Sequence, residues 1–156
     1  MSMISVEVGT DGTHEYASGI SAGEVIRNVH GKKSGALAAL VDGEQRDMSF
    51  VLDSDCKIEP ILGGSDEGLY ILRHSCAHLL AQAVTELYPE AKPTIGPPID
   101  HGFYYDFLME PIGDDELRLI QKRMKELSRQ NLAIEREDHD NEALRSMFAE
   151  NHFKLE

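Results

Sequence analysis

The sequence contains no tryptophan, and its acidic residues outnumber its basic ones almost two to one. Fifteen Lys and Arg against 28 Asp and Glu give a formal net charge of −13. Phosphate backbones are held mainly by Lys and Arg, so this balance argues against wholesale nucleic-acid binding by this chain alone. It leaves room for a local site that another part of a larger protein would hold on nucleic acid.

Long apolar runs and cysteines are also scarce. No stretch reaches the run of about 18 apolar residues that a membrane helix needs, so no membrane span is expected. The first residues, MSMISVEV, lack the basic and apolar regions of a signal peptide. Cys56 and Cys76 are interpreted as reduced thiols rather than a disulfide, which favours a cytoplasmic location.

The chain does have enough apolar material, 41% of 156 residues, for one ordinary domain or two small ones. In its first part, Ser21 begins a helix, and Glu24 three residues later completes a capping box. Hairpin turns are predicted at Asp11-Gly12 and Asp42-Gly43. Strands are expected near 4–8, 14–17, 36–41, 44–47 and 57–62. The order strand, strand, helix, strand, strand, strand predicts an α+β domain with a compact β-grasp topology.

The pair Gly63-Gly64 separates this block from a second one. Two glycines give a flexible link, and Ser65 directly after them is a helix-capping residue with two acids in the following turn. The sequence therefore predicts two domains, residues 1–63 and 64–156.

The helix predicted from Ser65 to about Tyr88 carries His74 and His78 on one face, one turn apart. That spacing lets two imidazoles share one water, one substrate or one metal ion. At about 100° per residue, a core face forms on the opposite side. It consists of Leu69, Leu72, Cys76, Leu79, Leu80, Ala83 and Leu87. The residues that flank the histidines are small: Ala77, Ala81 and Thr85. The histidine face is either a solvated face or the wall of a pocket, and its shortage of Lys, Glu and Gln favours the pocket.

Beyond Pro89, further prolines exclude a regular helix. The expected elements are an extended segment at 95–99, a turn at 100–102, a strand at 103–107, a helix that opens at Asp114, a strand at 132–137, a helix capped by Asp140, and a strand that begins at 153–156. Because that last strand has only begun, we expect the chain to be truncated.

Two runs in this second block, RHSCAHLLAQAV and IGPPIDHGFYYDF, make residues 65–107 resemble the amino-terminal editing domain of threonyl-tRNA synthetases. The preceding block resembles the TGS domain, a β-grasp module that opens many of those enzymes, and the helix-strand-helix predicted at 114–150 is similar to the next segment of their editing domain. The Cys-x-x-x-His motif that completes related editing sites is missing, as is the ATP-binding catalytic domain. The resemblance is therefore to an N-terminal fragment: a TGS-like domain, then part of an α+β editing domain with a long His-bearing helix.

The resemblance implies a function and a set of site residues. The family ligates threonine to its tRNA using ATP, and this region would hydrolyse mischarged seryl-tRNA. His74 and His78 would be catalytic, and Gly96 and Tyr105 would contact the substrate. Strand alternation puts Tyr105 beside two phenylalanines, so a core role for it stays open and Tyr104 is the alternative. No cofactor or metal is expected in this fragment, whereas ATP, magnesium and zinc are expected in the catalytic domain that it lacks.

The resemblance also implies partners: threonine-specific tRNA through the parent protein, a homodimeric parent, a monomeric fragment, and no membrane. Two other functions compete with editing. A non-enzymatic module that binds RNA or a protein partner through the TGS-like domain stays open. A zinc metallohydrolase is disfavoured, because its helix motif requires Glu directly after the first His and this chain has Ser75 there.

Overall fold

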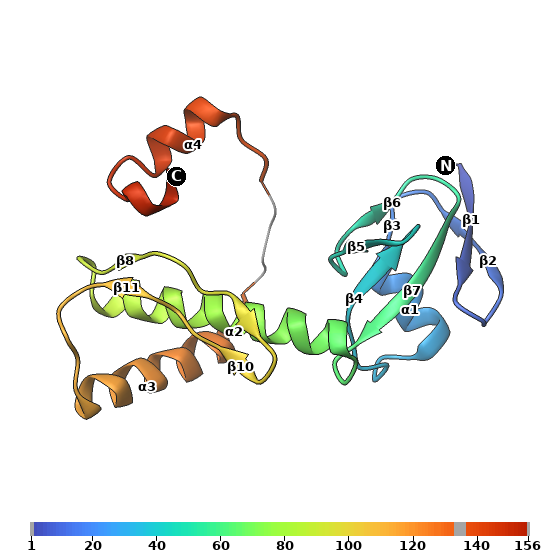
Figure 1. The fold of residues 1–156 in the computed structure, drawn as a ribbon. Coiled ribbons are helices and arrows are strands. Elements are labelled where there is room, and N and C mark those ends of the chain that lie inside the picture. Colours follow the sequence, from blue (N-terminus) through green and yellow to red (C-terminus); the bar gives the residue numbers. More distant parts are fainter. Residues whose placement is uncertain (1, 133–136, 156) are drawn as a thin grey trace. The chain divides into compact units, whose positions relative to one another are not determined.

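The structure is a computed structural model that describes residues 2–132 and 137–155. The chain is α+β and divides into two compact units, residues 1–72 and 73–156 (Figure 1). This division falls inside one long helix, so the first two turns of that helix group with the first unit. The domain boundary predicted at Gly63-Gly64 stays a prediction.

The first unit is built on a five-stranded mixed sheet with the order β2-β1-β7-β4-β5. Its strands are β1 Met3–Val8, β2 Thr13–Ala17, β4 Ala36–Val41, β5 Glu44–Arg46 and β7 Cys56–Leu62. β1 and β7 are parallel, and all other pairs are antiparallel. The two short strands β3 Ile20–Ser21 and β6 Val51–Leu52 form a separate antiparallel pair, which the sequence did not predict because two residues show no alternation.

Helix α1, Ala22–His30, begins with the predicted capping box. Ser21 Oγ accepts a hydrogen bond from the Glu24 amide at 3.3 Å, and the Glu24 carboxylate accepts one from the Ser21 amide at 3.0 Å. The Ser21 hydroxyl also donates a hydrogen bond to the Glu24 carboxylate at 2.8 Å, and the bonds from the Ser21 amide and hydroxyl lower the pKa of Glu24. With its first turn held in this way, α1 turns Val25 and Ile26 into the core.

The core of the first unit lies between α1 and one face of the sheet. Its most deeply buried side chains come from α1, β1 and β7: Val6, Val8, Val25, Ile26 and Ile58. Every second residue of β1 is buried, as the alternation in the sequence predicts.

Ser65 makes the connection from β7 to helix α2, Asp66–Leu87. Its Oγ accepts a hydrogen bond from the Gly68 amide at 3.0 Å and donates one to the Leu62 carbonyl at 2.9 Å. The chain turns so tightly here that a Cβ on Gly68 would lie 1.9 Å from that same carbonyl oxygen. Gly68 is therefore needed for close backbone approach, not for an unusual backbone angle.

The second unit contains the rest of α2, two short antiparallel strand pairs and further helices. β8 Lys92–Pro93 pairs with β11 Phe107–Leu108, and β9 Pro98–Ile99 pairs with β10 Gly102–Phe103. Helix α3 is Asp114–Gln130, α4 is Asn141–Met147, and η1 is a 3-10 helix at His152–Lys154. Buried side chains of α2 and α3 form its core with Ala91: Ala83, Val84, Ile120 and Leu127. Within the described ranges, no helix is long and apolar enough to cross a membrane.

The predicted faces of α2 were only partly right, whereas the predicted cap of α4 is confirmed. Ala77, predicted to flank the histidines, is buried, whereas Leu72 and Leu87, predicted as core, are exposed. Small residues such as Ala83 lie at the buried contact with α3. The buried face of α2 is therefore rotated around the helix axis from the face predicted from its leucines. Asp140 caps α4 as predicted, accepting a hydrogen bond from the Ala143 amide at 2.8 Å.

The strand predicted to begin at Phe153 is wrong for the described residues, because His152–Lys154 form η1, closed by hydrogen bonds over three residues, and residue 156 lies outside the described residues. The strand predicted at 132–137 lies for the most part outside the described residues.

We expect Gly68→Ala to lower the free energy of unfolding by up to about 2 kcal/mol. Alanine is the better helix former by about 1 kcal/mol, but overpacking against the Leu62 carbonyl costs about 1–3 kcal/mol and forces the turn apart. Urea unfolding followed by circular dichroism measures the change. Gly64→Ala is the control, because its added Cβ has no atom within 4 Å. Equal effects of the two changes would contradict the tight turn.

Candidate active site

His74 and His78 form the centre of the candidate site on α2, and both belong to the second unit. Their Nε2 atoms lie 3.0 Å apart, within hydrogen-bonding distance. The two rings meet edge to face, with centroids 4.6 Å apart and planes at 89°. Both residues are exposed. The structure therefore brings the two predicted catalytic histidines into direct contact on a face that solvent reaches.

This contact determines which protons the pair can carry. For an Nε2-to-Nε2 hydrogen bond, one ring supplies Nε2–H and the other a lone pair. If both rings are neutral, the two Nδ1 atoms then differ: one carries a lone pair and the other a proton. Such a pair contains one proton acceptor and one proton donor, which are the two roles needed for general acid–base chemistry.

The electrostatic surroundings favour the neutral form of His78. Partial desolvation of the ring, although the residue as a whole is exposed, is the largest cause that lowers the pKa of His78, followed by the positive charges of His74, when protonated, and of Lys154. A nearby cation disfavours the imidazolium, so the shift runs in the direction that leaves a lone pair available at neutral pH.

Lys154 comes to this site from the far end of the chain. Its ammonium donates a hydrogen bond to the Thr94 carbonyl at 3.3 Å, and Asn151 Nδ2 donates one to the Pro93 carbonyl at 3.0 Å. These two bonds attach the segment around η1 to the segment that follows β8. Neither residue was predicted from the sequence, because no local pattern marks a contact made over some 60 positions.

Gly96 and Tyr105, the two residues implied as substrate contacts, lie against each other. Backbone hydrogen bonds join Thr94 and Ile95 to Asp106, which sets the two segments side by side. A Cβ on Gly96 would lie 2.1 Å from Cδ2 of Tyr105, so only glycine leaves room for that ring.

Tyr105 also packs against Phe107, whereas the side chain of its neighbour Tyr104 is exposed. The Tyr105 ring stacks on Phe107 with centroids 4.8 Å apart and planes at 25°. Tyr104 is exposed. The Tyr105 ring thus has a packing role, and the Tyr104 side chain is accessible. The single strand predicted at 103–107 is wrong, because the segment divides into β10 and β11 and residues 104–106 between them are not in a strand.

The histidine pair by itself is a poor metal site. Two imidazoles supply half of a tetrahedral set, and protein zinc sites use three or four ligands. Among residues 2–132 and 137–155, no group of three or more His, Cys, Asp and Glu is placed to hold a metal ion. Cys76, two residues from each histidine, is half-buried.

Comparison with known proteins finds relatives that share the name threonine--tRNA ligase. Three proteins called threonine--tRNA ligase match over most of this chain. The one from Thermobifida fusca is 47% identical over 141 residues, 90% of this chain and 21% of the relative. Those from Thermoplasma acidophilum and Streptomyces griseus are 44% and 42% identical over 80% and 92% of this chain, and over 19% and 21% of their own lengths. No family model matches. The chain spans about a fifth of the length of these relatives.

We expect Lys154→Met to raise the pKa of His78, because the change removes a positive charge that disfavours the imidazolium. Protonation of His78 would then begin at a higher pH than in the unchanged protein. NMR titration of the histidine ring carbons measures this directly. Lys32→Met, which removes an equal charge from an exposed position in the first unit, is the control. An unchanged His78 titration in Lys154→Met would contradict the proximity of the ammonium.

Proposed function

Because this chain is homologous to a region of the threonine--tRNA ligases, we propose that it serves such an enzyme as an editing module that hydrolyses seryl-tRNA. The observation that carries this proposal is the direct contact of His74 and His78, at 3.0 Å, on an exposed face. Ligation of threonine to tRNA with ATP would belong to parts of the protein outside this chain. The partner of this region would be threonine-specific tRNA.

We also propose domain identities. The first unit has a helix packed on a mixed sheet whose central strands are parallel, an arrangement compatible with a TGS-like β-grasp domain. The second unit would be the first part of an editing domain. The proposed boundary remains at Gly63-Gly64, directly before the Ser65 cap.

The chemistry of discrimination explains why such a module is needed. Serine lacks one methyl group of threonine, and a group of that size supports only about 1–3 kcal/mol of binding discrimination. Protein synthesis requires more, and a second site that hydrolyses the wrong ester is the usual solution for synthetases.

Ester hydrolysis requires one group to take a proton from water and another to give a proton to the leaving ribose oxygen. The histidine pair can hold both roles at once, since its hydrogen bond leaves one Nδ1 as acceptor and the other as donor. In our proposal His78 or its partner accepts the proton as water adds to the seryl carbonyl. Lys154, which shares the electrostatic surroundings of His78, would favour the negative charge that develops on the carbonyl oxygen.

We expect His74→Ala and His78→Ala, in the full-length protein that carries this region, to slow seryl-tRNA hydrolysis by about 10²–10⁴-fold, the usual size of general acid–base catalysis. Aminoacylation with threonine should stay near its original rate. Both side chains are exposed, so their loss should open no core cavity. Deacylation of mischarged tRNA and thermal melting, measured side by side, test this.

Cys76→Ala is the matched control, because it truncates a half-buried residue between the two histidines. We expect Cys76→Ala to lower the melting temperature and to have a smaller effect on the rate of seryl-tRNA hydrolysis. The rival function, a non-enzymatic RNA- or partner-binding module, predicts that the histidine variants have a lower melting temperature and an unchanged deacylation rate. Unchanged deacylation in both histidine variants would reject the editing proposal.

The two tyrosines give a further test of the site. We expect Tyr104→Ala to leave the melting temperature within about 2 °C and to weaken seryl-tRNA hydrolysis, because the side chain is exposed and free to meet a substrate. Tyr105→Ala should lower the melting temperature, since that ring packs against Phe107 and Gly96. If Tyr104→Ala leaves hydrolysis unchanged, Tyr104 is not a substrate contact.

A further inference from the structure

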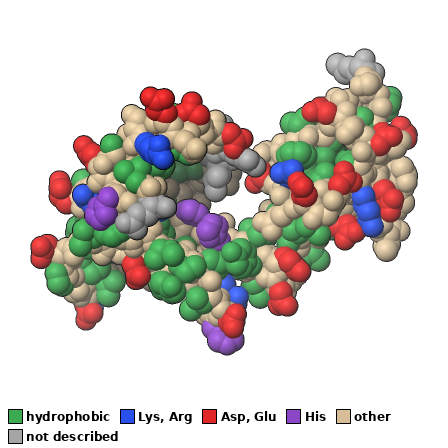
Figure 2. Space-filling view, turned by 45° about the horizontal axis from the view of Figure 1, so that its top comes forward, with side chains coloured by type: hydrophobic (Ala, Val, Ile, Leu, Met, Phe, Trp, Pro, Cys, Tyr) green, Lys and Arg blue, Asp and Glu red, His purple; other side chains and the backbone are tan. Residues whose placement is uncertain are grey.

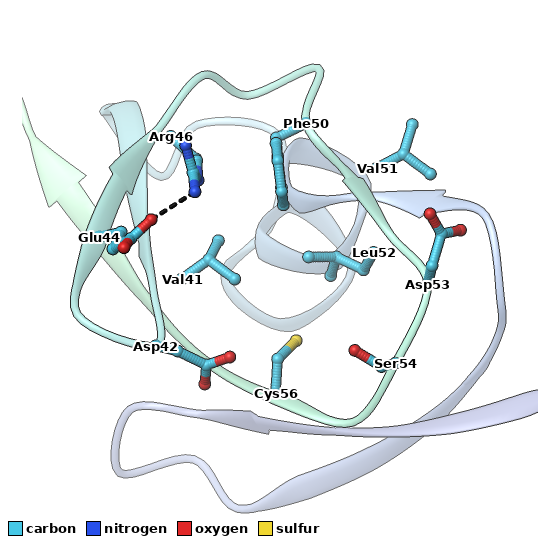
Figure 3. A pocket seen from close by; sticks show the side chains of 10 residues that line it. All are labelled: Val41, Asp42, Glu44, Arg46, Phe50, Val51, Leu52, Asp53, Ser54 and Cys56. Carbon is cyan, nitrogen blue, oxygen red and sulfur yellow. Dashed lines mark hydrogen bonds and ion pairs between the residues drawn. The ribbon is translucent and has the colours of Figure 1, made fainter.

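Asn151, in the second unit, has a buried polar atom without a partner. Its Oδ1 accepts no hydrogen bond from the residues that the structure describes. The hollow of the first unit in Figure 3 shows the more usual arrangement, because on its rim Arg46 pairs with Glu44 and lies over the Phe50 ring. An unpaired buried acceptor is unfavourable, so the other contacts of Asn151 must account for its place in the fold.

Those contacts tie the C-terminal segment to the segment that follows β8. Asn151 Nδ2 donates a hydrogen bond to the Pro93 carbonyl at 3.0 Å. The backbone carbonyl of Asn151 accepts one from the Lys154 amide at 2.9 Å, which closes the turn of η1. From this turn the Lys154 ammonium donates to the carbonyl of Thr94, the residue after Pro93, at 3.3 Å. One residue therefore both anchors the segment and closes the turn that carries Lys154.

The segment that receives these bonds is itself held in place. Pro93 pairs with Phe107 in the ladder of β8 and β11. The amide and the hydroxyl of Thr94 both donate hydrogen bonds to the Asp106 carbonyl, at 3.0 and 2.9 Å. The two carbonyls that accept from Asn151 and Lys154 thus belong to a paired segment and give η1 a fixed support.

A fixed support matters for Lys154 because carboxylates compete for its charge. The chain has 28 Asp and Glu against 15 Lys and Arg, and Figure 2 shows acidic side chains over much of the visible surface. A lysine ammonium stands on a flexible four-carbon stem, so an unanchored one would pair with any carboxylate in reach. Lys154 is instead hydrogen bonded to a neutral carbonyl, and its charge acts on His78.

We propose that Asn151 is a positioning residue, which fixes η1 on residues 93–94 so that the Lys154 ammonium acts on the histidine pair. The inference rests on the proposed function, because it assigns a role within the same site. Partial desolvation, the charge of protonated His74 and the charge of Lys154 all lower the pKa of His78. Asn151 reaches His78 only through the last of these three causes, and that dependence can be tested.

The test is an NMR titration of the histidine rings in the full 156-residue chain, with Asn151→Leu as the variant. Leucine keeps the size and branching of asparagine but has no donor for the Pro93 carbonyl. We expect the pKa of His78 to rise, as in Lys154→Met, because the ammonium is no longer held near the ring. In a chain that already carries Lys154→Met, the same change should leave the His78 titration as it was, because the charge is gone.

Two outcomes of these titrations would overturn the proposal. One is an unchanged His78 titration in Asn151→Leu, and the other is an equal further rise in the double variant. Asn141→Leu is the matched control, because it makes the same substitution at an exposed position of α4 in the same segment. A shift in Asn141→Leu as large as in Asn151→Leu would show a general disturbance of the segment and would also overturn the proposal.

Hydrolysis of seryl-tRNA by the full-length protein that carries this region gives the second readout. Asn151→Leu should lower kcat about 10- to 100-fold with little change in KM, because a small misplacement of a charged group near the chemistry costs that much. If the unchanged protein hydrolyses no seryl-tRNA, the proposed function fails and the titrations alone decide the role of Asn151. If it does hydrolyse seryl-tRNA and Asn151→Leu is equally fast, the positioning role fails.

Discussion

The hydrogen bonds of Ser65 are the constraint on which the organisation of this chain depends. They end β7 and start α2 within three residues, and they do so only because Gly68 has no side chain to meet the Leu62 carbonyl. Once α2 has started there, its 3.6-residue period decides which side chains share a face. His74 and His78 then share one face, while Ala83 and Val84 pack in the core of the second unit. A shift of the helix start would change how far the two histidines lie from the beginning of α2, but not their mutual contact.

The contact between the histidines is local, whereas their chemistry depends on distant residues. Two imidazoles four positions apart would meet on any helix, and meeting alone does not set their charge. The charge is biased by burial and by Lys154, which hydrogen bonds to the Thr94 carbonyl rather than to a carboxylate. An ammonium held by a neutral carbonyl keeps its full charge for its neighbours. This explains why the C-terminal segment belongs to the candidate site even though it carries no motif of its own.

The residues that the sequence predicted well share one property: their signal is complete within a few positions. Ser21 with Glu24, Asp140, and the turn at Asp42-Gly43, whose φ angles are 50° and 82°, all satisfy their own backbone groups locally. The predictions that failed depend on partners far away in sequence. Ala77 is buried because of what packs on it, and the pair β3 and β6 exists because two distant short segments meet. Residues 152–154 form η1, where the sequence predicted the start of a strand. Periodicity shows which apolar residues of a helix share a face, but the elements that pack against the helix decide which of those residues are buried.

The charge of the chain sets a last condition on the proposed function. A region with a net charge of −13 repels a polyanion such as tRNA at long range, and screening limits that repulsion to about 8–10 Å at physiological salt. Productive contact would therefore depend on the few cations near the site. The charge of Lys154 acts on His78, and α3 adds Lys125 and Arg129, which border one hollow with Leu79 and have no carboxylate partner among the described residues. Under the proposed function, such an arrangement would admit the ester end of a tRNA without binding the body of the molecule, and most of the affinity for tRNA would come from contacts outside these residues.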